Sequence, residues 1–231
     1  MRATHVAVAG ATGAAVAWSL PALAAVAPPV AGLCGLECRV PARDAVALTF
    51  DDGPHREGTP AVLGALARAG ALATFFLVGE QVERNPALAG EIAAAGHGIA
   101  LHGYRHRNLL RLSAGAVAED LRRGAAAVQD ATGVVPQLYR PPYGIFSAAG
   151  LAVVRRAYRP LLWSRWGRDW RASATADTIA SKLTAELRAG DVLLLHDADH
   201  YSAAGSWRAT AASLPRVLAE IERRSLRTAV V

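Results

Sequence analysis

Short hydrophobic runs alternate with longer amphipathic stretches from residue 44 to the end of the chain. The runs predict strands near 46–50, 73–79, 98–103, 136–144 (a short strand that continues into a loop), 160–164, 191–196 and 226–231. Helices are predicted near 60–69, 86–95, 114–131 and 147–158, with others between the later strands. This alternation predicts an α/β fold with a parallel sheet and helices outside it. About seven strands fit a distorted, incomplete (β/α) barrel, and a doubly wound open sheet is the alternative.

The N-terminal segment differs from the rest, because residues 3–36 contain no Asp, Glu, Lys or Arg. Its apolar stretch is about 20 residues long, which fits a secretory signal ending near Ala22-Leu23-Ala24 or an uncleaved membrane anchor kinked by Pro21. A buried Ala-rich helix of a cytoplasmic enzyme is the alternative. We expect residues 1–43 to be an export signal or anchor plus linker, and residues 44–231 to be the catalytic domain. The protein is then extracytoplasmic, with possible membrane contact through this segment.

Two cysteines, Cys34 and Cys38, follow the apolar segment in the sequence CGLEC. Outside the cytoplasm a disulfide across this short loop is plausible. A structural metal site is less favoured, because two thiolates supply only half of a tetrahedral ligand set. Whether the two thiols pair is left open by the sequence.

Composition narrows the class of partner. The chain has 231 residues, of which 52% are hydrophobic, so it can bury a core and is not disordered. A net charge of +6 can hold an acidic partner such as an anionic wall polymer, although the abundance of Ala and Arg explains it as a composition bias. No interleaving of aromatic and basic residues indicates a nucleic-acid groove. The oligomeric state cannot be read from the sequence.

Ionisable and aromatic residues recur where the predicted strands end. They are Asp51 and Asp52, His102 and His106, Arg140 and Tyr143, Asp169 and Trp170, and His196. In a barrel of parallel strands, the carboxyl ends of the strands form the reactive face. We therefore expect these side chains to surround one site.

The sequence HGYRH places His102 and His106 four residues apart. On a helical turn this spacing puts both imidazoles on one face, close enough to share an ion. A carboxylate from another strand would complete a three-ligand site of the type used for catalytic zinc. Asp51 and Asp52 end one strand, and adjacent residues there point to opposite sides. One carboxylate can therefore bind the metal while its neighbour faces the substrate pocket.

Five motifs occur together in a fixed order: TFDDGP, HGYRH, RPPYG, RDW and LLLH. This set resembles the polysaccharide deacetylase family, the NodB homology domain of carbohydrate esterase family four. The resemblance spans residues 44–231 and implies a distorted (β/α) barrel. It also implies a metal-dependent hydrolase that removes N-acetyl groups from amino sugars of peptidoglycan or chitin-type glycans and releases acetate.

The resemblance implies roles for the residues of the first motifs. Asp51 would be the general base. The metal ligands would be Asp52, His102 and His106, and Arg140 would hold the Asp51 carboxylate. Zn²⁺ is the expected ion, and Co²⁺, Ni²⁺ and Mn²⁺ suit the same ligands.

The later motifs supply the rest of the implied site. Tyr143 would offer its backbone N–H to the oxyanion, and Asp169 would tune the acid histidine or pair with Arg140. Trp170 would wall the acetyl or sugar pocket, and Leu194 would line the acetyl pocket. His196 would be the general acid.

One position departs from the family pattern: Gly103 follows the first metal histidine, where the family usually has Ser or Thr. The missing hydroxyl is expected to weaken support of the loop between the ligands.

Other residues carry weaker expectations. The histidines His55 and His200 are expected in loops, where contact with the substrate is the less favoured interpretation. Asp197 and Asp199 are expected in solvated loops, and Trp163, Trp166 and Trp207 as core residues or a sugar-stacking surface.

Two rival functions remain open. An O-acetyl esterase acting on xylan or another glycan would use the same residues, because amide and ester hydrolysis pass through a similar oxyanion. An inactive glycan-binding module would be expected to lack some of Asp51, Asp52, His102, His106 and His196, and all five are present. The sequence therefore favours an enzyme over a binding module.

Overall fold

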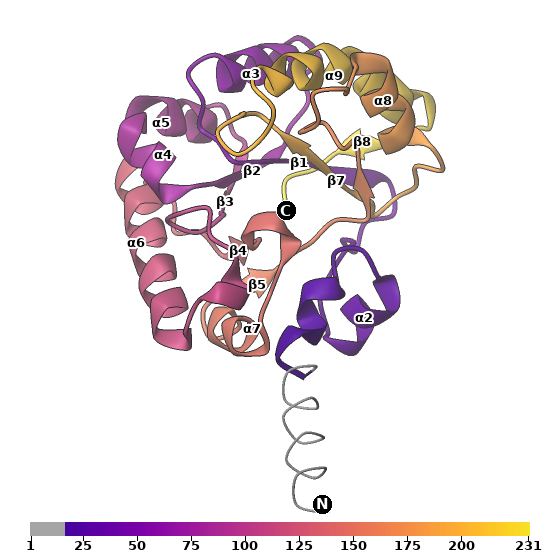
Figure 1. Cartoon of the computed structure of the whole chain (residues 1–231). Helices are drawn as coiled ribbons and strands as arrows, with labels where there is room; N and C mark the ends of the chain where they lie inside the picture. Colours follow the sequence, from indigo (N-terminus) through magenta and orange to yellow (C-terminus); the bar gives the residue numbers. More distant parts are fainter. Residues whose placement is uncertain (1–16) are drawn as a thin grey trace, which may run out of the picture.

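The computed structural model describes residues 17–231, and a parallel β-sheet forms the centre of the molecule (Figure 1). Its strands are β1 (Ala45–Asp51), β2 (Thr74–Leu77), β3 (Gly98–Leu101), β4 (Leu138–Tyr139), β5 (Arg159–Pro160), β6 (Arg165–Trp166), β7 (Val192–His196) and β8 (Arg227–Thr228). Seven of them follow one another in the order β5-β4-β3-β2-β1-β7-β6. The short β8 pairs with the start of β1, where Ala45 lies beside Arg227.

The sheet is curved but not closed. Within residues 17–231, the two ends of the strand order, β5 and β6, do not pair with each other. A segment before β1 forms two isolated β-bridges to the sheet. Glu37 pairs with Leu161, directly after β5, and Arg39 pairs with Asp191, directly before β7. The α/β fold and the incomplete barrel predicted from the sequence are therefore confirmed.

Helices cover the outside of the sheet (Figure 1). They are α3 (Gly58–Arg68), α4 (Gly79–Arg84), α5 (Pro86–Ala94), α6 (Ala114–Thr132), α7 (Ala148–Val154), α8 (Ala176–Thr184) and α9 (Ser206–Arg223). Helices α3, α8 and α9 pack on one another on one side, and α4, α5, α6 and α7 continue around the other. Two 3-10 turns, η2 (Leu109–Arg111) and η3 (Pro142–Gly144), lie in the connecting loops.

The central strands are buried on both faces, which explains their nearly continuous hydrophobic sequences. All seven residues of β1 and all four of β2 are buried. Phe50 of β1 and Phe75 of β2 stack with their ring centroids 5.1 Å apart. This packing fixes the register of β1 and β2, and with it the direction in which the residues after each strand emerge.

The strand predicted at 160–164 is divided in the structure. Strand β5 ends at Pro160, and β6 begins at Arg165. Between them the carbonyl oxygens of Leu161 and Leu162 accept hydrogen bonds from the guanidinium of Arg140. These carbonyls bind a buried side chain, so the segment is not continuous strand, and the hydrophobic pattern alone could not reveal this.

Part of the predicted export segment packs on the domain. The 3-10 turn η1 (Leu20–Leu23) and helix α2 (Pro28–Leu33) place Ala24, Ala31 and Leu36 in the hydrophobic core. The segment also touches the loop at η3, because a Cβ on Gly144 would lie 2.8 Å from that of Ala25. The beginning of the predicted export segment, residues 1–16, lies outside the described residues.

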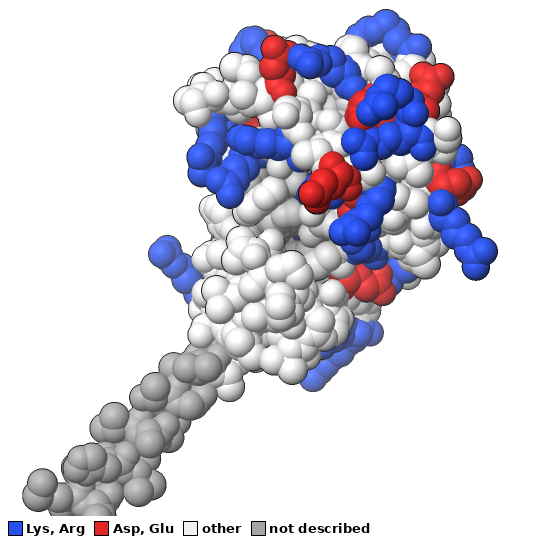
Figure 2. All heavy atoms as spheres, turned by 90° about the vertical axis from the view of Figure 1, so that its right-hand side faces the viewer, with Lys and Arg blue, Asp and Glu red and all other residues white. Residues whose placement is uncertain are grey.

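The outer face of this segment is apolar. Trp18, Leu23, Val26 and Leu33 are exposed. Figure 2 shows that the surface next to the N-terminal segment is free of Lys, Arg, Asp and Glu, whereas charges of both signs cover the rest of that face. Among the described helices, none is both long and apolar enough to cross a membrane. Cys34 and Cys38 are half-buried free thiols, so this structure contains no disulfide between them.

Candidate active site

A pocket of about 320 Å³ opens at the carboxyl ends of the strands. It is lined by Asp51, Asp52, His102, His106, Tyr143, Gly144, Trp163, Trp166, Trp170, Leu194, His196, Tyr201 and Ser202. These include every residue assigned to the site from the sequence except Arg140 and Asp169, which are fully buried behind the pocket wall. The structure thus brings five separate motifs to one place.

The end of β1 directs two adjacent carboxylates to the pocket. Asp51 is the last residue of the strand and lies in register with His196 of β7. Asp52 has a left-handed backbone (φ 79°), which turns the chain out of the strand. Only a glycine fits next in sequence, because a Cβ on Gly53 would lie 2.4 Å from the carboxylate of Asp197. The Asp-Asp-Gly sequence therefore makes a turn that exposes both carboxylates to one pocket.

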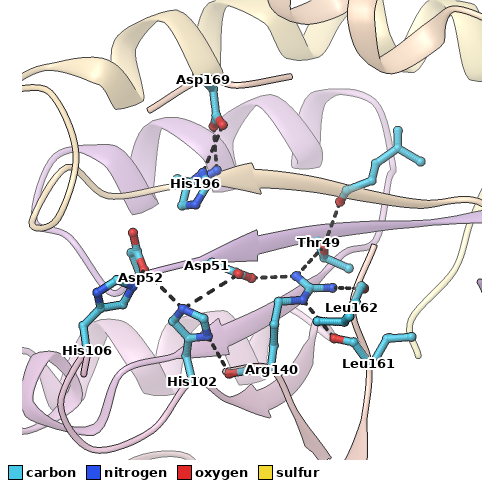
Figure 3. Close-up of polar contacts among 11 residues, drawn as sticks. Thr49, Asp51, Asp52, His102, His106, Arg140, Leu161, Leu162, Asp169 and His196 are labelled. Carbon is cyan, nitrogen blue, oxygen red and sulfur yellow. Dashed lines mark hydrogen bonds and ion pairs between the residues drawn. The ribbon is translucent and has the colours of Figure 1, made fainter. Parts of the chain in front are cut away.

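Three potential metal ligands converge in this pocket (Figure 3). The Oδ1 atom of Asp52 lies 3.5 Å from Nε2 of His102 and 3.3 Å from Nε2 of His106. Nδ1 of His102 lies 2.8 Å from the carbonyl oxygen of Arg140. A carbonyl only accepts hydrogen bonds, so Nδ1 carries the proton and Nε2 directs its lone pair at Asp52. This is the tautomer that a metal ligand requires.

The spacing of His102 and His106 is that of a helical turn, but the two histidines do not lie on a helix. His102 follows β3, and residues 102–106 form a loop. Gly103 has φ +85°, a conformation that favours glycine, and it lets the loop turn both rings toward Asp52. The helical turn inferred from the spacing is therefore absent at residues 102–106. The two rings nevertheless lie close together, with their centroids 5.3 Å apart.

The electrostatics of these ligands suit a cation. Burial opposes the charge of Asp52, but the neighbouring histidines outweigh it and lower its pKa to about 2. Burial is the main cause that lowers the pKa of His106 to about 4. At neutral pH the set is therefore a carboxylate and an uncharged imidazole, the forms that bind metals. Oδ1 of Asp52 is buried without a hydrogen-bond partner in the described structure, and a cation would satisfy it.

Arg140 binds Asp51 from behind the pocket (Figure 3). Its Nη1 donates to Oδ1 of Asp51 at 2.7 Å and to Oγ1 of Thr49 at 2.9 Å. Nε and Nη2 donate to the carbonyls of Leu161 and Leu162. The guanidinium is fully buried, and its carbon lies 3.9 Å from the ring centre of Phe76. Asp51 is thereby fixed with its second oxygen facing the pocket, 3.9 Å from His102.

Asp169 binds His196 on the opposite side of the site (Figure 3). Its Oδ1 accepts the proton of His196 Nδ1 at 3.0 Å, since a carboxylate can only accept. Burial opposes a charge on this ring, but Asp169, followed by Asp52 and Asp51, outweighs it and raises the pKa of His196 to about 10. His196 is therefore an imidazolium at neutral pH, and its remaining proton is on Nε2. Of the two partners considered for Asp169, the structure selects His196 rather than Arg140.

Aromatic rings form the rest of the pocket wall. Trp166 contacts both other tryptophans, with its ring centroid 5.7 Å from that of Trp163 and 5.5 Å from that of Trp170. Trp170 and His196 make a T-shaped contact with centroids 5.6 Å apart, and Leu194 also lines the pocket. Trp207, grouped with the other tryptophans from the sequence, instead packs against His55 outside the pocket.

Sequence reasoning missed Tyr201 and Ser202, which also line the pocket. Tyr201 stacks on His106 with centroids 4.1 Å apart and an interplanar angle of 8°. Its hydroxyl donates to Glu80 and accepts from Gln81 of α4. The only available signal was its position a few residues after His196, in the loop that leaves the sixth predicted strand.

The buried Asp197 contradicts the expectation of a solvated loop position. Its side chain is inaccessible, and Oδ2 accepts a hydrogen bond from the hydroxyl of Thr59. Desolvation is the main cause that raises its pKa to about 7. The carboxylate packs under Gly53 and so supports the turn that carries Asp51 and Asp52.

A second group of imidazoles and carboxylates, His55, Asp199 and His200, lies close enough to share an ion. Nδ1 of His55 accepts from the backbone amides of Glu57 and Gly58, so it carries no proton. The proton is therefore on Nε2, which faces Asp199 at 3.2 Å. A protonated Nε2 is not a metal ligand, and we assign this group to loop structure.

Known proteins that are similar to this chain point to one family. The family model for polysaccharide deacetylase matches residues 39–159, more than half of the chain. A peptidoglycan-N-acetylglucosamine deacetylase of Bacillus cereus is 34% identical over 191 residues, covering 80% of this chain and 85% of that protein. The deacetylase PgdA of Listeria monocytogenes is 34% identical over 178 residues, covering 77% of this chain.

The chain spans only 36% of the length of that Listeria protein. Among solved structures, the Bc1960 peptidoglycan N-acetylglucosamine deacetylase superposes with a TM-score of 0.78 at 28% identity, covering 85% of this chain and 90% of that one. The incomplete barrel of this chain agrees with these matches. This chain belongs to the polysaccharide deacetylase family.

Proposed function

We propose that this protein is a metal-dependent hydrolase that removes N-acetyl groups from amino sugars of a glycan, of the peptidoglycan or chitin type. One observation carries the proposal: a single pocket contains three potential metal ligands together with a proton acceptor and a proton donor. Asp51 can accept a proton, and His196 can donate one. The names of the relatives from Bacillus cereus and Listeria monocytogenes favour peptidoglycan as the substrate.

The ligands of the metal are Asp52, His102 and His106. A divalent ion held there would polarise the acetyl carbonyl and lower the pKa of a water molecule. Zn²⁺ suits two imidazoles and one carboxylate, and Co²⁺, Ni²⁺ and Mn²⁺ are the alternatives.

Proton transfer is divided between two residues that face the same pocket. Asp51, held by Arg140, accepts a proton from the attacking water. The backbone N–H of Tyr143 donates to the oxyanion of the tetrahedral intermediate. His196 then gives its Nε2 proton to the leaving amine, which without a proton is a very poor leaving group. Asp169 keeps His196 protonated for this step.

The lining of the pocket supports a small acyl group on a sugar. Leu194 and Trp170 offer an apolar surface for the acetyl methyl group. Trp166 is half-buried, extends this wall and supplies a face on which a sugar ring can stack, and the buried Trp163 packs against it. A glycan is accordingly the proposed partner, and no feature of the described surface calls for nucleic acid.

We further propose that the protein acts outside the cytoplasm, with residues 1–43 as its export or anchoring segment and residues 44–231 as its catalytic domain. Support comes from the absence of charged residues between positions 3 and 36 and from the exposed Trp18, Leu23 and Val26. Burial of Ala24 and Ala31 in the core favours retention of the segment over cleavage after Ala24. Amino-terminal sequencing of the mature protein would distinguish the two, and a mature chain that begins at Ala25 would contradict retention.

Acetate release from an N-acetylglucosamine oligomer tests the proposed reaction. Purified protein is assayed as isolated, after chelation and after Zn²⁺ is restored, with Asp51→Asn as the matched inactive variant. We expect activity that chelation removes, that Zn²⁺ restores and that Asp51→Asn lacks.

Acetylated xylan is assayed in parallel, because the rival O-acetyl esterase would use the same residues. Faster acetate release from xylan than from the oligomer would favour the esterase. No acetate from either substrate, with metal shown to be bound, would refute deacetylation and favour a glycan-binding module.

A further inference from the structure

The loop that joins the two metal-binding histidines is held by a carboxylate from another element. Asp120 of α6 is buried, and its Oδ2 accepts the backbone N–H of Tyr104 at 2.7 Å. Its Oδ1 lies 3.4 Å from the N–H of Arg105 and 2.8 Å from Nη2 of Arg107. One side chain thus binds two consecutive amides between His102 and His106, and the guanidinium compensates its charge.

The carbonyl groups of the same loop are bound from the other side. The oxygens of Gly103 and Tyr104 accept the backbone amides of Gly79 and Glu80, at the start of α4. Donors of α4 and the acceptor of α6 therefore hold the loop between them. The fit is close, because a Cβ on Gly103 would lie 2.8 Å from Oδ2 of Asp120, and one on Gly124 would lie 2.9 Å from the amide nitrogen of Tyr104.

The two imidazoles depend on this loop to different degrees. Nδ1 of His102 has its own partner, the carbonyl of Arg140. Nδ1 of His106 is buried without a hydrogen-bond partner among the described residues. Its ring contacts Tyr143 and Tyr201, at 4.5 Å and 4.1 Å between centroids, and its Nε2 faces Asp52 at 3.3 Å. The backbone of the loop therefore sets where His106 lies along these rings.

We propose that Asp120 is a positioning residue for the metal site, which acts by fixing the loop that carries His106. Its carboxylate occupies the space that a side chain at position 103 would need, and it supports the loop from a neighbouring helix. The inference rests on the proposed function, because it assumes that Asp52, His102 and His106 bind a metal. Asp120 itself is not among the residues that line the pocket.

The test measures Zn²⁺ affinity by competition with a chelator, using the full chain and Asp120→Asn. Asparagine has the same shape but cannot accept from both amides and Arg107 at once. We expect Zn²⁺ binding to weaken by about 10- to 100-fold, the range seen when a group supporting a metal ligand is removed. Glu119→Gln is the matched control, because Glu119 precedes Asp120 on α6 but is exposed and pairs with Arg122. Its Zn²⁺ affinity should equal that of the wild type.

A second readout separates positioning from a general role in folding. The melting temperature is measured for each protein without metal and with saturating Zn²⁺. We expect Asp120→Asn to reduce the increase in melting temperature that Zn²⁺ produces more than it lowers the melting temperature of the metal-free protein. Equal losses in the two states, or a variant that does not fold even with Zn²⁺, would assign Asp120 to the fold and overturn the proposal.

The outcome is independent of acetate release. Unchanged Zn²⁺ affinity in Asp120→Asn, with normal binding by the wild type, would overturn only the role of Asp120. A wild-type protein that binds no divalent metal would instead overturn the metal-dependent function on which the inference rests.

Discussion

Asp169 binds His196 twice, through its ring and through its backbone. Oδ1 accepts the Nδ1 proton at 3.0 Å, and Oδ2 accepts the backbone N–H at 2.7 Å. The hydroxyl of Thr210 donates to the same Oδ2 at 2.8 Å. Three donors of the protein therefore bind the two oxygens of this carboxylate. One buried aspartate therefore sets the tautomer, orientation and charge of the histidine that we propose as the general acid.

Asp169→Asn should shift the pH dependence of acetate release. A general acid must carry its proton, so activity falls as the pH rises through its pKa. Burial lowers the pKa of His196, but Asp169, followed by Asp52 and Asp51, outweighs it and raises the pKa to about 10. A neutral asparagine at position 169 removes the largest of these attractions. We expect the basic limb of the kcat profile to move to lower pH by about 1–3 units. The profile is measured from pH 5 to 10, and an unshifted basic limb would exclude His196 as the acid.

Arg140→Met should destabilise the protein and abolish activity. The substitution leaves the carboxylate of Asp51 buried without its cation and removes all four hydrogen bonds of the guanidinium. Breaking a buried ion pair in this way costs about 3–5 kcal/mol of the free energy of unfolding. Urea denaturation measures this loss.

Arg208→Met is the control for Arg140→Met. Arg208 pairs with Glu57 at 3.1 Å, but both side chains are more than 60% exposed. Loss of such a surface pair should cost less than about 1 kcal/mol. If the two substitutions lower the free energy of unfolding equally, the buried ion pair would not stabilise the fold more than the surface pair does.

Tyr201 should contribute to metal affinity through its ring. Tyr201→Phe keeps the stack on His106 and loses only the hydrogen bonds to Glu80 and Gln81, so Zn²⁺ affinity should stay within about twofold of the wild type. Tyr201→Ala removes the ring and should weaken binding by about 10-fold. Both are measured by chelator competition. A greater loss in Tyr201→Phe than in Tyr201→Ala would assign the effect to the hydroxyl instead.

Asp197→Asn should reduce the pH dependence of stability. Burial raises the pKa of Asp197 to about 7, above its ordinary value of 3.8. A group whose pKa is raised by folding stabilises the fold below its unfolded pKa, and this stabilisation is lost as the pH rises through the folded pKa. The wild type should therefore lose free energy of unfolding between pH 4 and pH 8.

The asparagine variant lacks this ionisation, so its loss over the same range should be smaller. Urea denaturation at pH 4, 6 and 8 makes the comparison for both proteins. The same decline in both would show that Asp197 does not titrate in this range.

Local patterns in the sequence were sufficient for the main elements of the fold. The runs before Asp51, His102 and His196 became β1, β3 and β7, because strands buried on both faces require continuous hydrophobic residues. Parallel strands then bring their carboxyl ends together, which is why residues from five distant motifs could be expected at one site.

Other features depended on contacts that no local pattern encodes. The segment at 161–164 is apolar like a strand, but Arg140 binds two of its carbonyls. His102 and His106 have helical spacing, but a glycine at φ +85° and the carboxylate of Asp120 shape the chain into a loop. Asp197 reads as a polar loop residue, yet it is buried beneath Gly53.

The sequence by itself determined which chemical groups this protein can use: two adjacent aspartates, paired histidines, an arginine and a further histidine, each near the end of a strand. Only the tertiary structure decided how they are paired, with Arg140 on Asp51, Asp169 on His196 and Asp120 beneath the histidine loop. The physical reason is the range of the interactions. Strand and turn preferences act over a few neighbouring residues, whereas hydrogen bonds between buried charges join residues that are tens of positions apart and exist only once the core has formed.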